Sequence, residues 1–183
     1  MAKKASKMKR PSLEDLIKKY NFIVAFDPSQ DGTGFAVIDC RYKSPRVAEM
    51  GVVRGRTKTW PQDTPYQVKL SLIQAKAKEL RAKYDPIFPM VFLERGFSRF
   101  NNDTQATYRA RGALESELVG LLITEFTPSE VKKAATGDGS ASKEEVAQAM
   151  AKVFGLSVDD FETEDVSDAL AVGYTGYITY FIN

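Results

Sequence analysis

The chain has 183 residues, a length that fits one domain, and its content of 43% hydrophobic and 27% charged residues is typical of a soluble globular protein. It contains no histidine, which excludes Ser-His-Asp triads and His-ligated zinc or iron sites. One cysteine, Cys40, cannot form an internal disulfide, and no stretch is apolar enough to span a membrane, so we expect a cytoplasmic protein.

Basic residues concentrate at the start of the chain. The first ten residues hold five lysines and arginines and no acid, whereas the remaining residues carry 21 basic and 24 acidic side chains. We predict a mobile basic arm over residues 1–20, followed by a single domain over residues 21–183. A solubilising tail and an arm that binds a polyanion both explain this charge pattern.

The first part of the chain predicts three strands and a helix. An apolar, β-branched run at 21–27 ends in a carboxylate and is followed by turn-forming residues at 28–32. Segments 34–39 and 47–53 then predict two further strands of an antiparallel meander. A helix is predicted over 64–84, where apolar residues recur at helical spacing.

The second part alternates strands and helices. The unbroken apolar run at 86–94 predicts a central strand, and a polar loop at 95–103 leads to a helix over 104–122 and a short strand over 123–127. A capping box at Ser142 and Glu145 begins a helix over 142–154, and a last helix covers 165–181. This order predicts an α/β fold, a mixed five-stranded sheet with helices on both faces.

Four acidic residues occur where these elements begin or end. Asp27 and Glu94 close the two predicted central strands, where an ionised carboxylate is costly unless it is paired or binds a metal. Asp165 and Asp168 lie one turn apart on the last helix. Ordinary explanations exist, because Asp-Pro-Ser forms turns, Glu94 could pair with an arginine, and acids favour the first turn of a helix.

Taken together, the four carboxylates offer oxygen ligands that suit Mg²⁺ or Mn²⁺. Two such ions, about 4 Å apart, could activate a water molecule and stabilise the leaving oxygen of a phosphodiester. In a chain without histidine, metal-assisted hydrolysis is the chemistry that these residues support best.

These segments together resemble the RuvC family of Holliday junction resolvases, within the RNase H-like fold. The matching motifs are FIVAFDP with GTG at 22–34, FLE at 92–94 followed by Phe97, ARG at 110–112, PSEVKK at 128–133, GDGSASK at 137–143 and DVSDALA at 165–171. Bacterial members usually have glycine after the proline of the first motif, where this chain has Ser29. The chain looks more similar to phage-encoded relatives.

The resemblance implies a homodimeric, Mg²⁺-dependent endonuclease that nicks two strands of a four-way DNA junction symmetrically, in a bacterium or a phage-infected cell. It implies two ions per site, with Mn²⁺ as a substitute, held by Asp27, Glu94, Asp165 and Asp168. It places Lys132 and Lys143 beside them as catalytic residues. The implied DNA-binding residues are the aromatic Phe97 and six basic side chains: Arg95, Arg99, Arg111, Lys132, Lys133 and Lys143.

Three alternatives remain open to different degrees. An RNase H-like nuclease could use the same four acids on other branched DNA or on RNA:DNA hybrids. A non-catalytic junction-binding protein is disfavoured, because four carboxylates oppose DNA binding unless metal ions neutralise them. A sugar kinase or actin-like ATPase needs two domains around its nucleotide, and this chain is too short.

The helix over 104–122 is the candidate dimer interface.

Overall fold

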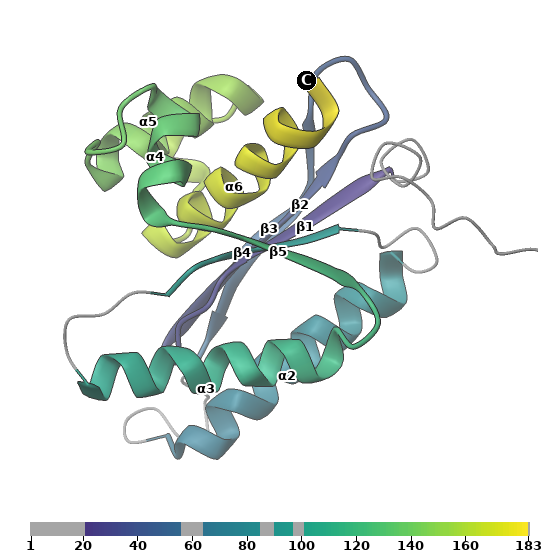
Figure 1. Cartoon of the computed structure of the whole chain (residues 1–183), viewed down its shortest axis with the longest axis vertical. Helices are drawn as coiled ribbons and strands as arrows, with labels where there is room; N and C mark the ends of the chain where they lie inside the picture. Colours follow the sequence, from purple (N-terminus) through teal and green to yellow (C-terminus); the bar gives the residue numbers. More distant parts are fainter. Residues whose placement is uncertain (1–20, 56–63, 85–89, 97–100, 183) are drawn as a thin grey trace, which may run out of the picture.

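The computed structural model describes residues 21–55, 64–84, 90–96 and 101–182, and its centre is one twisted sheet (Figure 1). The strands are β1 (Phe22–Asp27), β2 (Gly32–Asp39), β3 (Arg46–Arg54), β4 (Met90–Glu94) and β5 (Leu122–Phe126), in the spatial order β3-β2-β1-β4-β5. β1 pairs antiparallel with β2 and parallel with β4, and β4 pairs parallel with β5. The predicted mixed five-stranded sheet is confirmed.

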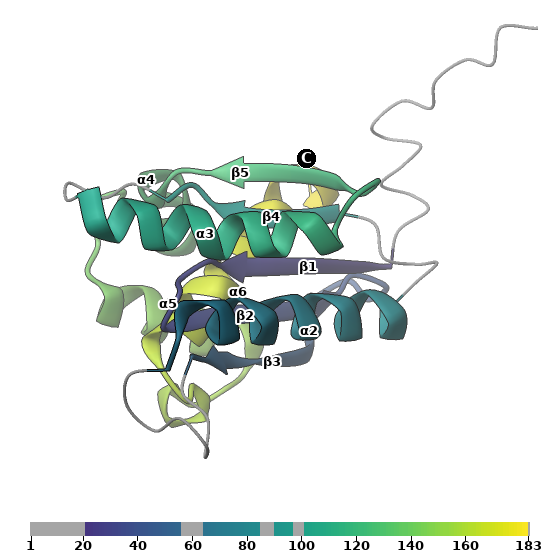
Figure 2. The same cartoon turned by 90° about the horizontal axis from the view of Figure 1, so that it is seen from below.

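Helices cover both faces of this sheet, as predicted (Figures 1 and 2). The helices α2 (Tyr66–Tyr84) and α3 (Asn101–Glu117) lie on one face. The other face carries α4 (Pro128–Thr136), α5 (Lys143–Phe154) and α6 (Glu164–Tyr177). A 3-10 turn over Val158–Asp160 precedes α6, and a π-helical turn over Ile178–Ile182 follows it.

The alternation of side chains along β1 divides the core into two layers. Val24 and Phe26 point toward α2 and α3, whereas Ile23 and Ala25 point toward α6, and all four are fully buried. A strand that is buried on both faces needs apolar residues at every position, which explains the unbroken run in the sequence. Each large side chain of this kind stabilises the fold by roughly 1.5–3 kcal/mol.

Two helices differ from the sequence-based expectation. The helix expected over 104–122 ends at Glu117, because the chain then turns through Gly120, whose φ of +87° is left-handed. Helix α4 was not predicted at all. It has a full capping box between Thr127 and Glu130 and a proline in its first turn.

Some expectations concern residues outside the described part of the chain. The basic arm at 1–20 is one of them, and residues 85–89 at the start of the predicted fourth strand are another. Among the helices that the structure describes, none is both long and apolar enough to cross a membrane.

Candidate active site

The fold brings the four predicted carboxylates to one edge of the sheet. Asp27 and Glu94 end the neighbouring parallel strands β1 and β4, and the register pairs Phe26 with Leu93, so the two acids lie side by side. Carboxyl ends of adjacent parallel strands are a common place for sites in α/β proteins. Asp165 and Asp168 reach the same edge from the first turns of α6, which packs across β1 and β2.

A glycine in β2 lets the start of α6 come this close. A Cβ atom built on Gly34 would lie 1.9 Å from the backbone oxygen of Asp165, and one on Gly32 would lie 2.8 Å from the Asp165 carboxylate. No side chain fits at the first position without moving α6. The glycines of the GTG motif therefore allow α6, which carries Asp165 and Asp168, to pack directly against β2.

Crowding of these acids changes their proton affinity. Burial, followed by the charges of Glu94, Asp168 and Asp165, holds the pKa of Asp27 well above its usual range. Burial and the charge of Asp168 raise the pKa of Glu94 to about 7. Burial also raises the pKa of Asp168, against the opposing effect of Lys143. Such pKa shifts are typical of a functional site in which several carboxyl groups lie close together. A bound cation would stabilise their ionised forms.

Two lysines face the acids. Lys143 Nζ lies 2.9 Å from Asp168 Oδ2 and 3.5 Å from a Glu164 carboxylate oxygen. Burial lowers the pKa of Lys143, but its hydrogen bond to Asp168 and the nearby negative charges outweigh burial and raise it. Lys132 of α4 joins Lys143, Glu94 and Asp168 in lining a cavity of about 210 Å³.

The donor set suits a hard divalent cation, although its side chains are not arranged around one. In the described residues, no three acidic or cysteine side chains are placed so as to enclose a metal ion. Asp168 is instead bound to Lys143, whereas neither Asp27 nor Glu94 has an ion-pair partner within 4.0 Å in the part described. Carboxylate oxygens are the ligands that Mg²⁺ and Mn²⁺ prefer, so the residues present fit such an ion.

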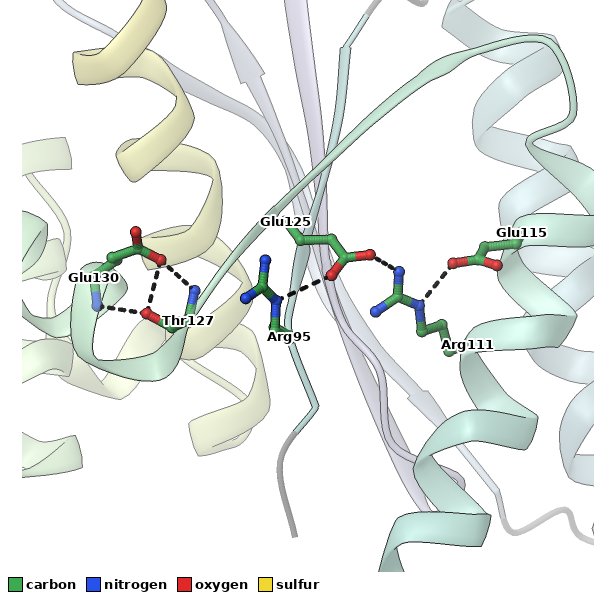
Figure 3. A network of polar contacts seen from close by, with 6 residues as sticks. All are labelled: Arg95, Arg111, Glu115, Glu125, Thr127 and Glu130. Carbon is green, nitrogen blue, oxygen red and sulfur yellow. Dashed lines mark hydrogen bonds and ion pairs between the residues drawn. The ribbon is translucent and has the colours of Figure 1, made fainter.

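The predicted DNA-binding residues are distributed unevenly. Lys133 is exposed on α4, and Arg95 is exposed just beyond β4. Arg111 is largely buried, and its guanidinium is held by Glu115 and Glu125 (Figure 3). Its placement supports a structural role, and contact with DNA stays a prediction. Phe97 and Arg99 lie outside the described residues.

Glu125, which links Arg95 to Arg111, was not among the predicted site residues. A charged residue inside a short apolar strand was a signal that could have drawn attention to it. The partners of Glu125 come from two other segments, and one sequence does not give their distances.

Comparison with known proteins identifies the family of this chain. The family model described as "Crossover junction endodeoxyribonuclease RuvC" matches residues 23–176. RuvC of Neisseria meningitidis is 33% identical over 84% of this chain and 83% of its own length, and RuvC of Synechococcus sp. WH7803 is 29% identical over 85% and 97%.

A solved structure of Thermus thermophilus RuvC in complex with a Holliday junction substrate has the same fold, with a TM-score of 0.74. It is 24% identical in sequence and covers 89% of this chain and 95% of its own. The matched range, residues 23–176, covers most of the chain, and the four carboxylates, the two lysines and the glycines beneath α6 lie within it. This chain belongs to the RuvC family of crossover junction endodeoxyribonucleases.

Proposed function

We propose that this protein resolves four-way DNA junctions by hydrolysing one phosphodiester in each of two opposed strands, with Mg²⁺ as its metal. The observation that carries the proposal is the convergence of Asp27, Glu94, Asp165 and Asp168 at one sheet edge, with Lys132 and Lys143 beside them. Membership of the RuvC family, whose members are metal-dependent nucleases, supports the reaction class.

Each residue has a role that follows from its chemistry. The four carboxylates would hold two Mg²⁺ ions, with Mn²⁺ as a substitute. Bound there, the ions would activate water and neutralise charge on the phosphate. Lys143 holds Asp168 in its present orientation, and its ammonium lies where it could bind a non-bridging phosphate oxygen. Lys132 adds a second positive charge across the cavity.

A junction presents two equivalent scissile phosphates, so we propose a two-fold symmetric dimer with one active site per subunit. Basic residues outside this cavity would contact phosphates without regard to sequence, and these are Arg95, Lys133 and the proposed basic arm over 1–20. Phe97 and Arg99 remain proposed contacts at the junction centre.

The direct test uses synthetic DNA at a fixed salt concentration. A four-way junction, a linear duplex of the same sequence and an RNA:DNA hybrid are incubated with the protein and Mg²⁺, and the cut positions are mapped. We expect paired, symmetric nicks in the junction and little cutting of the other two. Preferred cleavage of the hybrid would favour an RNase H-like hydrolase, and tight junction binding without any cleavage would favour an architectural protein.

Charge-removing substitutions separate chemistry from binding. Asp27→Asn and Glu94→Gln each remove a proposed metal ligand while nearly preserving shape, so cleavage should fall by roughly a hundredfold or more. Junction affinity measured without metal should stay level or rise, because one negative charge facing the phosphates is gone. Gel-shift titration and single-turnover cleavage measure the two effects. Near-normal nicking by folded Asp27→Asn protein would contradict the metal assignment.

A further inference from the structure

A bridge of ion pairs connects the end of β4 to α3 through β5 (Figure 3). Arg95 Nε donates to Glu125 Oε2 at 3.3 Å, and the other oxygen of Glu125 accepts from Arg111 Nη2. Arg111 Nε in turn donates to Glu115 Oε1 at 2.7 Å within α3. One carboxylate, that of Glu125, therefore holds two arginines from different elements.

The alternation of the strands explains why these groups meet. Leu93 pairs with Glu125 in the register of β4 and β5, and Leu93 belongs to the layer that packs on α2 and α3. Arg95 follows two residues after Leu93, just beyond the end of β4, and its Nε reaches the same Glu125 carboxylate. Glu94, between Leu93 and Arg95, points to the opposite face, where the other acids lie.

The backbone of Arg95 and Gly96 is also held in place, by β5 and by α3. The Arg95 amide donates to the backbone oxygen of Phe126 at 2.7 Å. A Cβ built on Gly96 would lie 2.5 Å from Thr107 of α3, so the chain passes directly against that helix. The segment that follows Glu94 is thus held between β5 and α3.

We propose that Glu125 is a positioning residue for strand cleavage: it ties Arg95 to Arg111, so that the end of β4, which carries Glu94, is fixed relative to α3. This inference rests on the proposed function, since it assigns Glu94 to the catalytic metal site. Glu125 itself lies on the far face of the sheet from the acids and touches neither metal nor substrate.

The two arginines differ in how firmly they are held. The Arg111 side chain is only 16% exposed and has two carboxylate partners, and the hydrogen bond from Arg111 lowers the pKa of Glu125, which keeps this carboxyl ionised. The Arg95 side chain is 58% exposed and has the single bond to Glu125. Arg95 can therefore add a phosphate contact on its open side while Glu125 sets its direction.

Three variants test the bridge in the full chain. Glu125→Gln removes the shared charge. Glu115→Gln is the matched control, because Glu115 also pairs with Arg111 but has no contact with Arg95 or β4. Arg95→Gln removes only the Arg95–Glu125 pair and leaves Glu125 bound to Arg111. It replaces Glu125→Gln as the test if that variant does not fold. Amide hydrogen exchange over residues 90–96 is measured without DNA, and single-turnover junction cleavage is measured over a range of Mg²⁺ concentrations.

We expect exchange over residues 90–96 to be about tenfold faster in Glu125→Gln and Arg95→Gln, and unchanged in Glu115→Gln. In Glu125→Gln, the cleavage rate at saturating DNA should fall about 10- to 100-fold, and the Mg²⁺ concentration for half-maximal rate should rise. Junction affinity should change less than threefold. A merely structural loss would lower stability without moving the Mg²⁺ midpoint.

Two results would overturn the proposal. The first is an exchange rate over residues 90–96 that is the same in Glu125→Gln as in the wild type. The second is an equal effect of Glu115→Gln and Glu125→Gln on exchange and cleavage. The exchange measurement needs no activity, so the bridge is tested even if the wild-type chain cuts no junction, a result that would count against the proposed function alone.

Discussion

Lys143 occupies a position that a helix ordinarily disfavours. It is the first residue of α5, directly after the capping residue Ser142, where the helix dipole is positive and acids are preferred. Its ion pair with Asp168 compensates for this placement. This position of Lys143 therefore favours the interaction with Asp168 at the expense of the helix dipole.

The buried carboxyls predict an unusual dependence of stability on pH. A carboxyl whose pKa is raised by folding binds its proton more tightly in the folded state, so its contribution to stability is complete below the unfolded pKa and is lost as pH rises through the folded pKa. For Glu94 this window runs from its ordinary 4.5 to about 7, and the pKa values of Asp27 and Asp168 are raised as well.

We therefore expect the free energy of unfolding of metal-free protein to fall between pH 4.5 and pH 7. Glu94→Gln should reduce this slope, because glutamine stays neutral, and Mg²⁺ should restore stability at pH 7.5 by binding the ionised acids. Urea denaturation in the presence of a chelator measures the effect. The lowered pKa values of Asp39 and Glu125 act below this window. Identical pH profiles for wild type and Glu94→Gln would contradict the expectation.

At the scale of elements, the packing of α6 against Gly34 of β2 positions two of the four acids. Gly34→Ala would place a methyl group on the backbone of Asp165, so we expect a loss of about 1–3 kcal/mol in stability and a displacement of Asp165 and Asp168. Chemical denaturation and the cleavage rate together measure it.

Gly112→Ala is the matched control for this substitution. Gly112 lies within α3 with nothing within 4 Å of an added Cβ, so alanine there should be neutral or should stabilise by about 0.5–1 kcal/mol through higher helix propensity. Equal stability of Gly34→Ala and wild type would show that α6 can shift freely and that its seating does not fix the acids.

Elements with strong local signals could be predicted from the sequence. The unbroken apolar runs at β1 and β4 and the capping box at Ser142 gave the right elements, because burial on both faces and an N-cap are encoded within a few residues. Helix α4 was missed although Thr127 and Glu130 form the same kind of box, since its short apolar pattern is weak.

The candidate site, too, has a part that could be predicted from the sequence and a part that could not. The four acids could be proposed from their places at element ends, and the family motifs added the lysines. The bond between Lys143 and Asp168 and the bridge through Glu125 join segments 25 and 30 residues apart, and their geometry depends on how helices and strands pack. A single sequence contains no measure of those distances.

At the scale of the whole molecule, α3 and the adjoining edge strand β5 form one side of the fold (Figure 2). Three large apolar side chains are exposed there or in the connecting turn, namely Tyr108 at 60%, Val119 at 70% and Leu122 at 42%. The apolar residues of α3 on its inner side, such as Ala110 and Leu114, pack in the core. Tyr108, Val119 and Leu122 are therefore the apolar residues of the predicted interface, residues 104–122, that a second subunit could contact.

We expect wild-type protein to have twice the chain mass in light scattering and Val119→Glu to shift it toward the monomer, because a buried unpaired carboxylate at a two-fold interface is introduced twice. Val158→Glu is the control: Val158 is also exposed, at 45%, but lies in the 3-10 turn before α6, away from α3. On junction DNA, the Val119→Glu protein should produce single, unpaired nicks, since the two cuts then no longer come from one complex. A monomer mass for the wild type, both alone and with junction DNA, would exclude the dimer, and paired nicking by a monomeric Val119→Glu protein would mean that the second active site arrives without this interface.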